Sequence, residues 1–252
     1  MKEAALMNNV ETILLDLEAQ MQDIGLSLMA KKLDEIYRSP NYLGIDKLDL
    51  VSEILASEYQ DRTTKRLSNR LKIARLIGTP CDISKCVDST AWQYTPAGAP
   101  KMLSSLKFLE NGLNLCILGD SDSRKTYLAK SLGTVACEKY RVNYNRCDEF
   151  LTALVDLKQS DYPKYERKIR KVQNFHLLII DDFLLNTVTD ERQVKVLLEV
   201  LDKRIELSRS TIVCSQREPD KWQAMIMNDA VSADAINKRI TKHYTIMIKH
   251  KE

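Results

Sequence analysis

Apolar residues recur at helical spacing through the first third of the chain. Leu14, Leu17 and Met21 mark one face of a helix, and Leu48 begins the apolar face of another. Glycine and proline, which interrupt helices, are sparse in this part of the sequence. Residues 1–78 are therefore predicted to form a small all-helical N-terminal domain.

The periodicity changes further along the chain. Residues 79–100 hold three prolines and little periodicity, which predicts a linker. From residue 101 short apolar runs alternate with helical patterns, and this alternation predicts a mostly parallel sheet flanked by helices, in an α/β domain over 101–252. The predicted strands are LNLCIL (113–118), RVNYNRC (141–147), HLLIID (176–181), STIVCS (210–215) and YTIMIK (244–249), and the helical patterns include 126–139, 190–207 and 218–227.

The composition, with 44% hydrophobic and 29% charged residues, is that of an ordinary globular protein. Its net charge of +3 conceals an uneven distribution, because residues 1–100 carry 12 basic and 14 acidic side chains while the remaining residues carry 26 and 21. The basic surplus in the second part indicates an anionic partner.

The cysteines and histidines indicate whether the chain binds structural zinc and which cellular compartment it occupies. Six cysteines form no CxxC pair and only three histidines are present, which disfavours structural zinc. Cys116, Cys137 and Cys214 lie in apolar runs, as free thiols do in a reducing cytosol. The N-terminus lacks the features of a signal peptide, and no segment approaches the roughly 18 uninterrupted apolar residues of a membrane span. We expect a cytoplasmic protein without a membrane partner.

A phosphate-binding loop follows the first predicted strand, and a helical pattern follows the loop. In such a loop backbone N–H groups cradle the phosphates of ATP, Lys125 neutralises the β and γ oxygens, and the Thr126 hydroxyl ligates Mg²⁺. The predicted nucleotide-binding residues are Gly119, Asp120, Ser121, Asp122, Ser123, Arg124, Lys125, Thr126 and Tyr127.

One position of this loop departs from the usual pattern, since Arg124 stands where GxxxxGK[ST] has glycine. A non-glycine residue held there in a left-handed conformation costs about 1–2 kcal/mol, and its side chain must point away from the nucleotide. The alternative is that the Gly-to-Lys-Thr spacing is fortuitous or belongs to a decayed site.

Polar residues end three further predicted elements. Asp181 and Asp182 follow a buried strand, and we assign Asp181 to Mg²⁺ and Asp182 to activation of the attacking water; the alternative is a helix cap or a solvated turn. Gln216 follows the next strand and is a candidate to sense the γ-phosphate. Arg239 precedes the last strand and is a candidate arginine finger on a neighbouring subunit's nucleotide, or else a surface cation.

A basic run in the N-terminal part is the candidate DNA contact. Spacings of three and four place several of its cations along one side of a helix, which suits phosphate contacts, although such a run is more often a solvated face. The predicted DNA-binding residues are Arg62, Lys65, Arg66, Arg70 and Lys72. A second basic cluster lies on a predicted helix over 164–171.

Five segments together resemble IstB-like transposition helper ATPases, which are related to the DnaC helicase loader and to DnaA. They are TTKRLSNRLKIARL, KTYLAKSLG, LLIIDDF, STIVCSQREPDKW and VSADAINKRITKHYTI, in that order. The resemblance implies a P-loop AAA+ domain behind a helical domain, oligomerisation on duplex DNA through ATP sites, and assistance to a partner transposase. It also implies the roles given above for Lys125, Thr126, Asp181, Asp182, Gln216 and Arg239. Three positions depart from many relatives: Arg124, Gln216 in place of asparagine, and Leu184 in place of glycine.

The leading hypothesis is therefore a DNA-binding AAA+ ATPase that uses ATP and Mg²⁺. Two alternatives stay open, a replication helicase loader of the DnaC type and a regulator whose nucleotide site is inactive because of Arg124. We predict that Arg124→Gly strengthens nucleotide binding and that Lys125→Ala abolishes it.

Overall fold

The computed structural model describes residues 2–78 and 81–251, and its contacts divide the chain into two compact units. The first unit ends at Ser68 and the second begins at Asn69, so the division falls inside a helix and ahead of the boundary predicted after residue 78. None of the described helices combines the length and the apolar character needed to cross a membrane.

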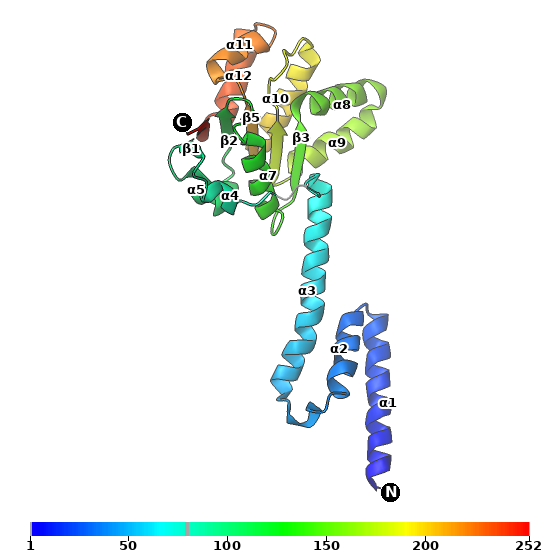
Figure 1. Ribbon diagram of the computed structural model, residues 1–252. Helices are drawn as coiled ribbons and strands as arrows, with labels where there is room; N and C mark the ends of the chain where they lie inside the picture. The colour runs from blue at the N-terminus through cyan, green and yellow to red at the C-terminus, as the bar shows by residue number, and fades with distance from the viewer. Residues whose placement is uncertain (1, 79–80, 252) are drawn as a thin grey trace. The chain divides into compact units, whose positions relative to one another are not determined.

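The first unit is helical, as predicted. Gly25, in a left-handed conformation with φ of 76°, separates its first two helices, which pack against each other (Figure 1). The Glu58 carboxylate accepts a hydrogen bond from the backbone N–H of Leu28 and another from Arg62. The elements are α1 (Lys2–Asp23), α2 (Ser27–Tyr37), a 3-10 turn (Tyr42–Gly44) and α3 (Lys47–Ala74), whose last turns belong to the second unit.

The second unit is built on a six-stranded sheet in the order β1-β6-β2-β5-β4-β3. All neighbouring strands are parallel except β1, which pairs antiparallel with β6 at one edge. The strands are β1 (Trp92–Thr95), β2 (Leu115–Gly119), β3 (Val142–Arg146), β4 (Leu177–Asp181), β5 (Ser210–Ser215) and β6 (Tyr244–His250). The five strands expected from apolar runs are confirmed, and so is the α/β fold with a mostly parallel sheet.

Helices cover both faces of this sheet. Because the chain crosses from β2 to β3 in one direction and returns through β4 and β5 to β6, right-handed connections put α7 on one face and the later helices on the other. The helices of the second unit are α4 (Ser84–Val87), α5 (Ala99–Ser104), α6 (Lys107–Glu110), α7 (Lys125–Ala136), α8 (Cys147–Ser160), α9 (Tyr162–Asn174), α10 (Glu191–Glu206), α11 (Trp222–Met225) and α12 (Ala230–Ile240). The helix expected over 218–227 is shorter, because a 3-10 turn at Pro219–Lys221 precedes α11.

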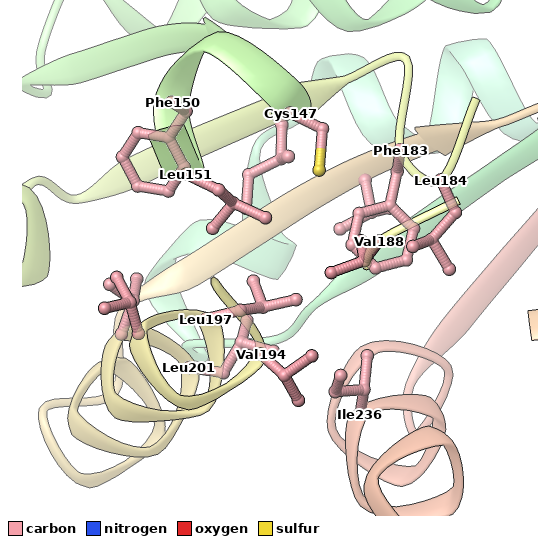
Figure 2. Close-up of a cluster of buried hydrophobic side chains, with 14 of the residues drawn as sticks. Cys147, Phe150, Leu151, Phe183, Leu184, Val188, Val194, Leu197, Leu201 and Ile236 are labelled. Atoms are coloured by element: carbon pink, nitrogen blue, oxygen red, sulfur yellow. The ribbon is translucent and has the colours of Figure 1, made fainter. Parts of the chain in front are cut away.

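The main core lies under the later helices. Phe150 and Leu151 of α8, Leu197 of α10 and Ile236 of α12 converge on the sheet and are almost completely buried (Figure 2). Burying such side chains contributes about 1.5–3 kcal/mol each. This packing fixes the strand ends from which the polar residues of the site project.

The structure corrects the predicted linker. Thr79 and Pro80 lie outside the described residues, but the rest of 79–100 contributes α4, β1 and α5 to the second unit. Pro96 falls just after edge strand β1 and Pro100 in the first turn of α5, where a missing N–H removes no structural hydrogen bond. Prolines at the ends of elements were mistaken for a stretch without elements.

Candidate active site

The phosphate-binding loop begins where β2 ends, at Gly119. A β-carbon on this residue would lie 2.5 Å from the Ile248 carbonyl oxygen and 2.6 Å from Ser123 Oγ, so the close approach of two backbones requires glycine. The loop then turns through Asp122, which has φ of 60°, and leads into α7 at Lys125. Strand, loop and helix thus occur in the predicted order.

Lys125 closes the loop from inside. Its buried ammonium donates hydrogen bonds to the carbonyl oxygens of Gly119 (2.7 Å) and Asp120 (2.5 Å) and to Ser123 Oγ (3.1 Å). Burial lowers the pKa of Lys125, and the nearby Cys214 and then Asp181 oppose that shift. The ammonium is therefore a charge held in the loop in the place where phosphate oxygens would bind.

Arg124 adopts the left-handed conformation expected of the missing glycine, with φ of 62° and ψ of 23°. Its guanidinium lies over the rings of Trp92, 5.9 Å from the centroid, and Tyr127, 5.6 Å from the centroid. Two cation–π contacts at about 0.5–1 kcal/mol each offset much of the 1–2 kcal/mol cost of the backbone conformation. Because the free chain already has this conformation, the strain weakens the fold and does not directly oppose nucleotide binding.

This geometry predicts that Arg124→Ala destabilises the second unit by about 1 kcal/mol more than Arg124→Gly. Both variants lose the cation–π contacts, but only alanine keeps the left-handed strain. Denaturant unfolding followed by tryptophan fluorescence measures the difference, since Trp92 and Trp222 both lie in the second unit. The same pair of substitutions at exposed Ser121, which has no positive φ, is the control and shows no advantage for glycine. Equal stability of the two Arg124 variants would contradict the strain argument.

The paired acids lie at the end of β4 in different settings. Asp181 is buried, and its Oδ2 accepts a 2.7 Å hydrogen bond from the Tyr144 hydroxyl. Asp182 is partly exposed, has φ of 53°, and lies 3.6 Å from Arg146 Nε. Burial and the neighbouring Asp181 raise the pKa of Asp182, while Arg146 opposes that shift. The two carboxylates are thus fitted to different tasks.

A single cavity of about 410 Å³ brings the loop and the strand ends together. The predicted residues that line it are Ser121, Asp122, Ser123, Arg124, Lys125, Thr126, Tyr127, Asp182 and Gln216. Gly119 and Asp120 border it through the carbonyls that hold Lys125, and Asp181 lies beside Asp182 at the same strand end. The Thr126 hydroxyl and a carboxylate at this edge are oxygen donors of the kind that Mg²⁺ prefers, so the residues present fit that ion.

Gln216 and Leu184 are placed by short segments after buried strands. Gln216 is exposed directly after Ser215, whose hydroxyl donates to the Phe183 carbonyl oxygen at 2.9 Å and accepts from the Arg217 N–H. Leu184 has φ of 53° and is 1% exposed. Burial of a leucine side chain, about 1.5–3 kcal/mol, offsets the left-handed cost of about 1–2 kcal/mol, which explains how leucine is accommodated in this conformation.

Arg239 is not brought to this cavity. It pairs with Asp202 of α10 and donates to the Ala235 carbonyl oxygen at 2.7 Å. Its own carbonyl accepts a 2.8 Å hydrogen bond from Asn114, which precedes β2. Arg239 therefore lies near the amino end of β2, whereas the phosphate-binding loop leaves the carboxyl end of the same strand.

Sequence reasoning missed three side chains that support the site: Tyr144 and Arg146 of β3, and Trp92 of β1. The parallel register pairs Arg146 with Asp181, and this register brings the β3 side chains beside the acids. No local motif marks them, since RVNYNRC carries only a weak strand pattern. Trp92 falls in the segment predicted as a linker, and its ring contacts the Arg124 guanidinium.

Several cations of the predicted DNA-binding run are engaged within the chain. Arg62 pairs with Glu58 (2.7 Å) and donates to the Gly25 carbonyl oxygen (2.8 Å), and Lys65 pairs with Asp61 (2.7 Å). Arg70 donates to the carbonyl oxygens of residues 137 and 138 just beyond the end of α7. Arg66 and Lys72 are exposed, and neither makes an ion pair with another described residue.

Comparisons with known proteins show which family this chain belongs to. A family model described as IstB-like ATP binding protein matches residues 19–252. A relative from Sinorhizobium fredii, named as an insertion-sequence ATP-binding protein, is 29% identical over 88% of both chains. A relative of the same description from Bacillus thuringiensis is 31% identical over 65% of both chains.

Solved structures share the fold. AMPPCP-bound DnaA from Aquifex aeolicus is similar with a TM-score of 0.56 and 19% identity, over 69% of this chain and 51% of DnaA. Domain III of Thermotoga maritima DnaA is similar with a TM-score of 0.54 and 20% identity, over 68% of both chains. DnaI is similar with a TM-score of 0.52 and 19% identity, over 60% of this chain and 83% of DnaI. The match spans about half of the Aquifex aeolicus DnaA chain in that structure, and the P-loop AAA+ fold is confirmed.

Proposed function

This chain belongs to the family of IstB-like ATP-binding proteins, and from that membership we propose that it is an ATPase that oligomerises on duplex DNA and assists a partner transposase. The observation that carries the proposal is the meeting of the Lys125 loop with Asp182 and Gln216 on one cavity. An ATP-binding loop without nearby carboxylates would bind ATP but have no group to activate water. Here the loop can hold the phosphates, Asp182 can activate the water and Gln216 can orient it.

The roles of the side chains follow from their positions. Lys125 exchanges its hydrogen bonds to loop carbonyls for hydrogen bonds to phosphate oxygens, and the N-terminus of α7 faces the same charge. Asp182 accepts a proton from the water that attacks the γ-phosphorus, and the bond to the β–γ bridging oxygen breaks to release ADP. Gln216 orients that water. Thr126 and Asp181 would hold Mg²⁺, which when bound would neutralise charge that develops on the phosphates.

Oligomerisation is supported by the place of Arg239. An arginine at the amino end of β2 cannot reach the chain's own phosphate loop at the carboxyl end, so as a finger it acts on a second copy. In this arrangement one chain holds an incomplete site. Hydrolysis per chain is then expected to rise with protein concentration.

The DNA and transposase parts rest on charge and on the relatives. Exposed Arg66 and Lys72 supply phosphate contacts of the sequence-independent kind, while Arg62 and Arg70 chiefly support the fold. The relatives are named for insertion sequences, which encode a transposase, and this context favours a transposase over a replicative helicase as partner.

One experiment tests the proposal. ATP hydrolysis is measured over a range of protein concentrations with and without duplex DNA, and retention of labelled DNA is measured with ATP and without nucleotide. We expect hydrolysis that rises with concentration and DNA that is retained more tightly with ATP. Protein that binds neither ATP nor DNA is the inactive regulator, and the proposal fails. Retention of a replicative helicase is measured in parallel. Protein that hydrolyses ATP and retains the helicase but no duplex DNA is the helicase loader, and the proposal fails equally.

A further inference from the structure

Arg124 is a cation of the ATP cavity without an acidic partner. It is exposed and lines the cavity, and no ion pair joins it to Asp122 or to any other acid in the part of the chain that the structure describes. Lys125, the next residue, is instead held inside the loop by three hydrogen bonds. A nucleotide that enters the cavity therefore meets a second positive charge, on the residue before Lys125.

The two rings that hold Arg124 are fixed, whereas its own side chain can turn. Trp92 packs edge-on against His250, with ring centroids 4.8 Å apart. The Tyr127 hydroxyl accepts a 3.1 Å hydrogen bond from the backbone N–H of Asp82 and donates one of 3.4 Å to the carbonyl oxygen of the same residue. The guanidinium rests on these rings through cation–π contacts alone among the described residues, so a phosphate can take it from them.

The order of the strands indicates which part of a nucleotide Arg124 faces. Strand β2, which leads into the loop, has β6 and β1 on one side and β5 and β4 on the other (Figure 1). Trp92 belongs to β1, whereas Gln216 and Asp182 follow β5 and β4. The guanidinium therefore lies on the side of the loop away from the groups assigned to the γ-phosphate. That side is left for the α-phosphate and the nucleoside.

We propose that Arg124 is a ligand of the α-phosphate of the bound nucleotide, and that its guanidinium leaves the Trp92 and Tyr127 rings to reach it. A guanidinium offers paired N–H donors to phosphate oxygens, and such charge-assisted hydrogen bonds are stronger than cation–π contacts at an exposed site. The proposal rests on the proposed function and gives the residue that replaces the loop glycine a role in binding. It reverses the expectation that Arg124→Gly strengthens nucleotide binding, because glycine removes this ligand.

A contact with the α-phosphate affects binding and hydrolysis differently. ATP and ADP share the α-phosphate, so Arg124 strengthens the binding of both equally. The contact is the same before and during attack on the γ-phosphorus. It therefore raises affinity without accelerating the chemical step.

Arg124→Gln in the full chain tests the contact. Glutamine keeps the β-carbon, and thus the strain of the left-handed backbone, but removes the charge. We expect the affinities for ATP, ADP and inorganic tripolyphosphate, measured by calorimetry, to fall about ten- to thirtyfold. The rate of hydrolysis at saturating ATP is expected to stay within about threefold of wild type. Arg124→Lys, which keeps the charge without the paired donors, is expected to restore part of the affinity.

The matched control is Lys130→Gln. It removes one charge from the same cavity and the same helix, but the Lys130 ammonium lies over the Tyr144 ring of β3, on the other side of β2 from Trp92. We expect it to change the three affinities by less than about fivefold, since one charge that touches no phosphate contributes only through screened attraction.

Acrylamide quenching of tryptophan fluorescence follows the movement of the guanidinium. Trp222 is completely buried, so quenching reports on half-buried Trp92. Tripolyphosphate has no base that could cover the Trp92 ring. We expect it to increase quenching in the wild type, as Arg124 leaves the ring, and to leave quenching unchanged in Arg124→Gln.

The outcomes separate this contact from its alternatives. Equal affinities of the wild type and Arg124→Gln for all three ligands would overturn it. Weaker binding of ATP and ADP with unchanged binding of tripolyphosphate would also overturn it, because Arg124 would then contact the nucleoside. Slower hydrolysis with unchanged affinity would assign Arg124 to the γ-phosphate and reject the proposal. A wild type that binds none of the three ligands would instead overturn the proposed function, on which the contact rests.

Discussion

Alanine at Lys125 is expected to weaken ATP binding at least about 100-fold. The lysine supplies charge-assisted hydrogen bonds to the β- and γ-phosphates, worth about 1.5–3 kcal/mol each, and about 1.4 kcal/mol corresponds to a factor of ten. In the free chain its ammonium joins Gly119, Asp120 and Ser123 across the loop. The substitution therefore removes both the charge and the contact that shapes the loop. Titration of a fluorescent ATP analogue measures the affinity.

The control is Lys130→Ala, which removes the same charge from the same cavity and the same helix. Lys130 lies over the Tyr144 ring, 4.6 Å from its centroid, and is not part of the loop. We expect it to change ATP affinity by less than about fivefold. Circular dichroism shows whether each variant keeps its helices. If Lys125→Ala binds ATP as tightly as Lys130→Ala, the loop does not bind phosphate and the assignment of this site is wrong.

The sequence predicts the strand, loop and helix around Lys125 well because the determinants of these elements are local. Gly119, Lys125 and Thr126 sit on one strand, loop and helix, and Asp181 ends a strand whose apolar residues identify it. In a parallel sheet the carboxyl ends of strands meet at one edge, so these local segments converge without further information. The same reasoning does not place Tyr144 or Arg146, because their role depends on the register between β3 and β4.

At Arg124 the motif predicts the backbone conformation but not the contact that stabilises it. The missing glycine correctly predicts a left-handed backbone, since the loop geometry is common to all such sites. The compensation comes from Trp92, 32 residues earlier, on a strand that was interpreted as a linker. A contact between an edge strand and a loop does not change the hydrophobic periodicity of either segment, so the sequence pattern cannot predict it. Whether the loop departs from its family in function was therefore not decidable from its residues alone.

The basic run illustrates why charge patterns are poor guides to contacts. Helical spacing groups its cations on one side of α3, but spacing does not reveal acids or carbonyls that meet them. Glu58 engages Arg62, and the carbonyl oxygens beyond the end of α7 engage Arg70. A cation held in this way contributes to the fold before it can contribute to DNA binding. Arg66 and Lys72 keep the predicted role as a prediction.

Substitution of the acids after β4 is expected to produce the second large effect, a loss of ATP hydrolysis. Asp182→Asn is expected to lower the rate of ATP hydrolysis by about 10²- to 10⁴-fold, the usual contribution of a positioned general base, while ATP affinity changes by less than about threefold. Asparagine keeps the shape of the side chain and tolerates the left-handed backbone at this position, so the fold is preserved. Hydrolysis is measured as phosphate release and binding by titration of an ATP analogue. Asp181→Asn is expected to differ, because loss of a Mg²⁺ ligand weakens binding of the magnesium–ATP complex as well as hydrolysis.

Asp122→Asn is the matched control for both acids. It removes a carboxylate from the same cavity, and it too replaces a residue with a left-handed backbone, φ of 60°, in a conformation that asparagine accepts. Its hydrolysis is expected to remain within about threefold of wild type, since exposed Asp122 has no part in the chemistry. The roles assigned to the two acids are supported if Asp182→Asn loses ATP hydrolysis and keeps ATP binding while Asp181→Asn loses both. If Asp182→Asn hydrolyses ATP as fast as Asp122→Asn, then Asp182 is not the base, and the buried strand end serves metal binding alone.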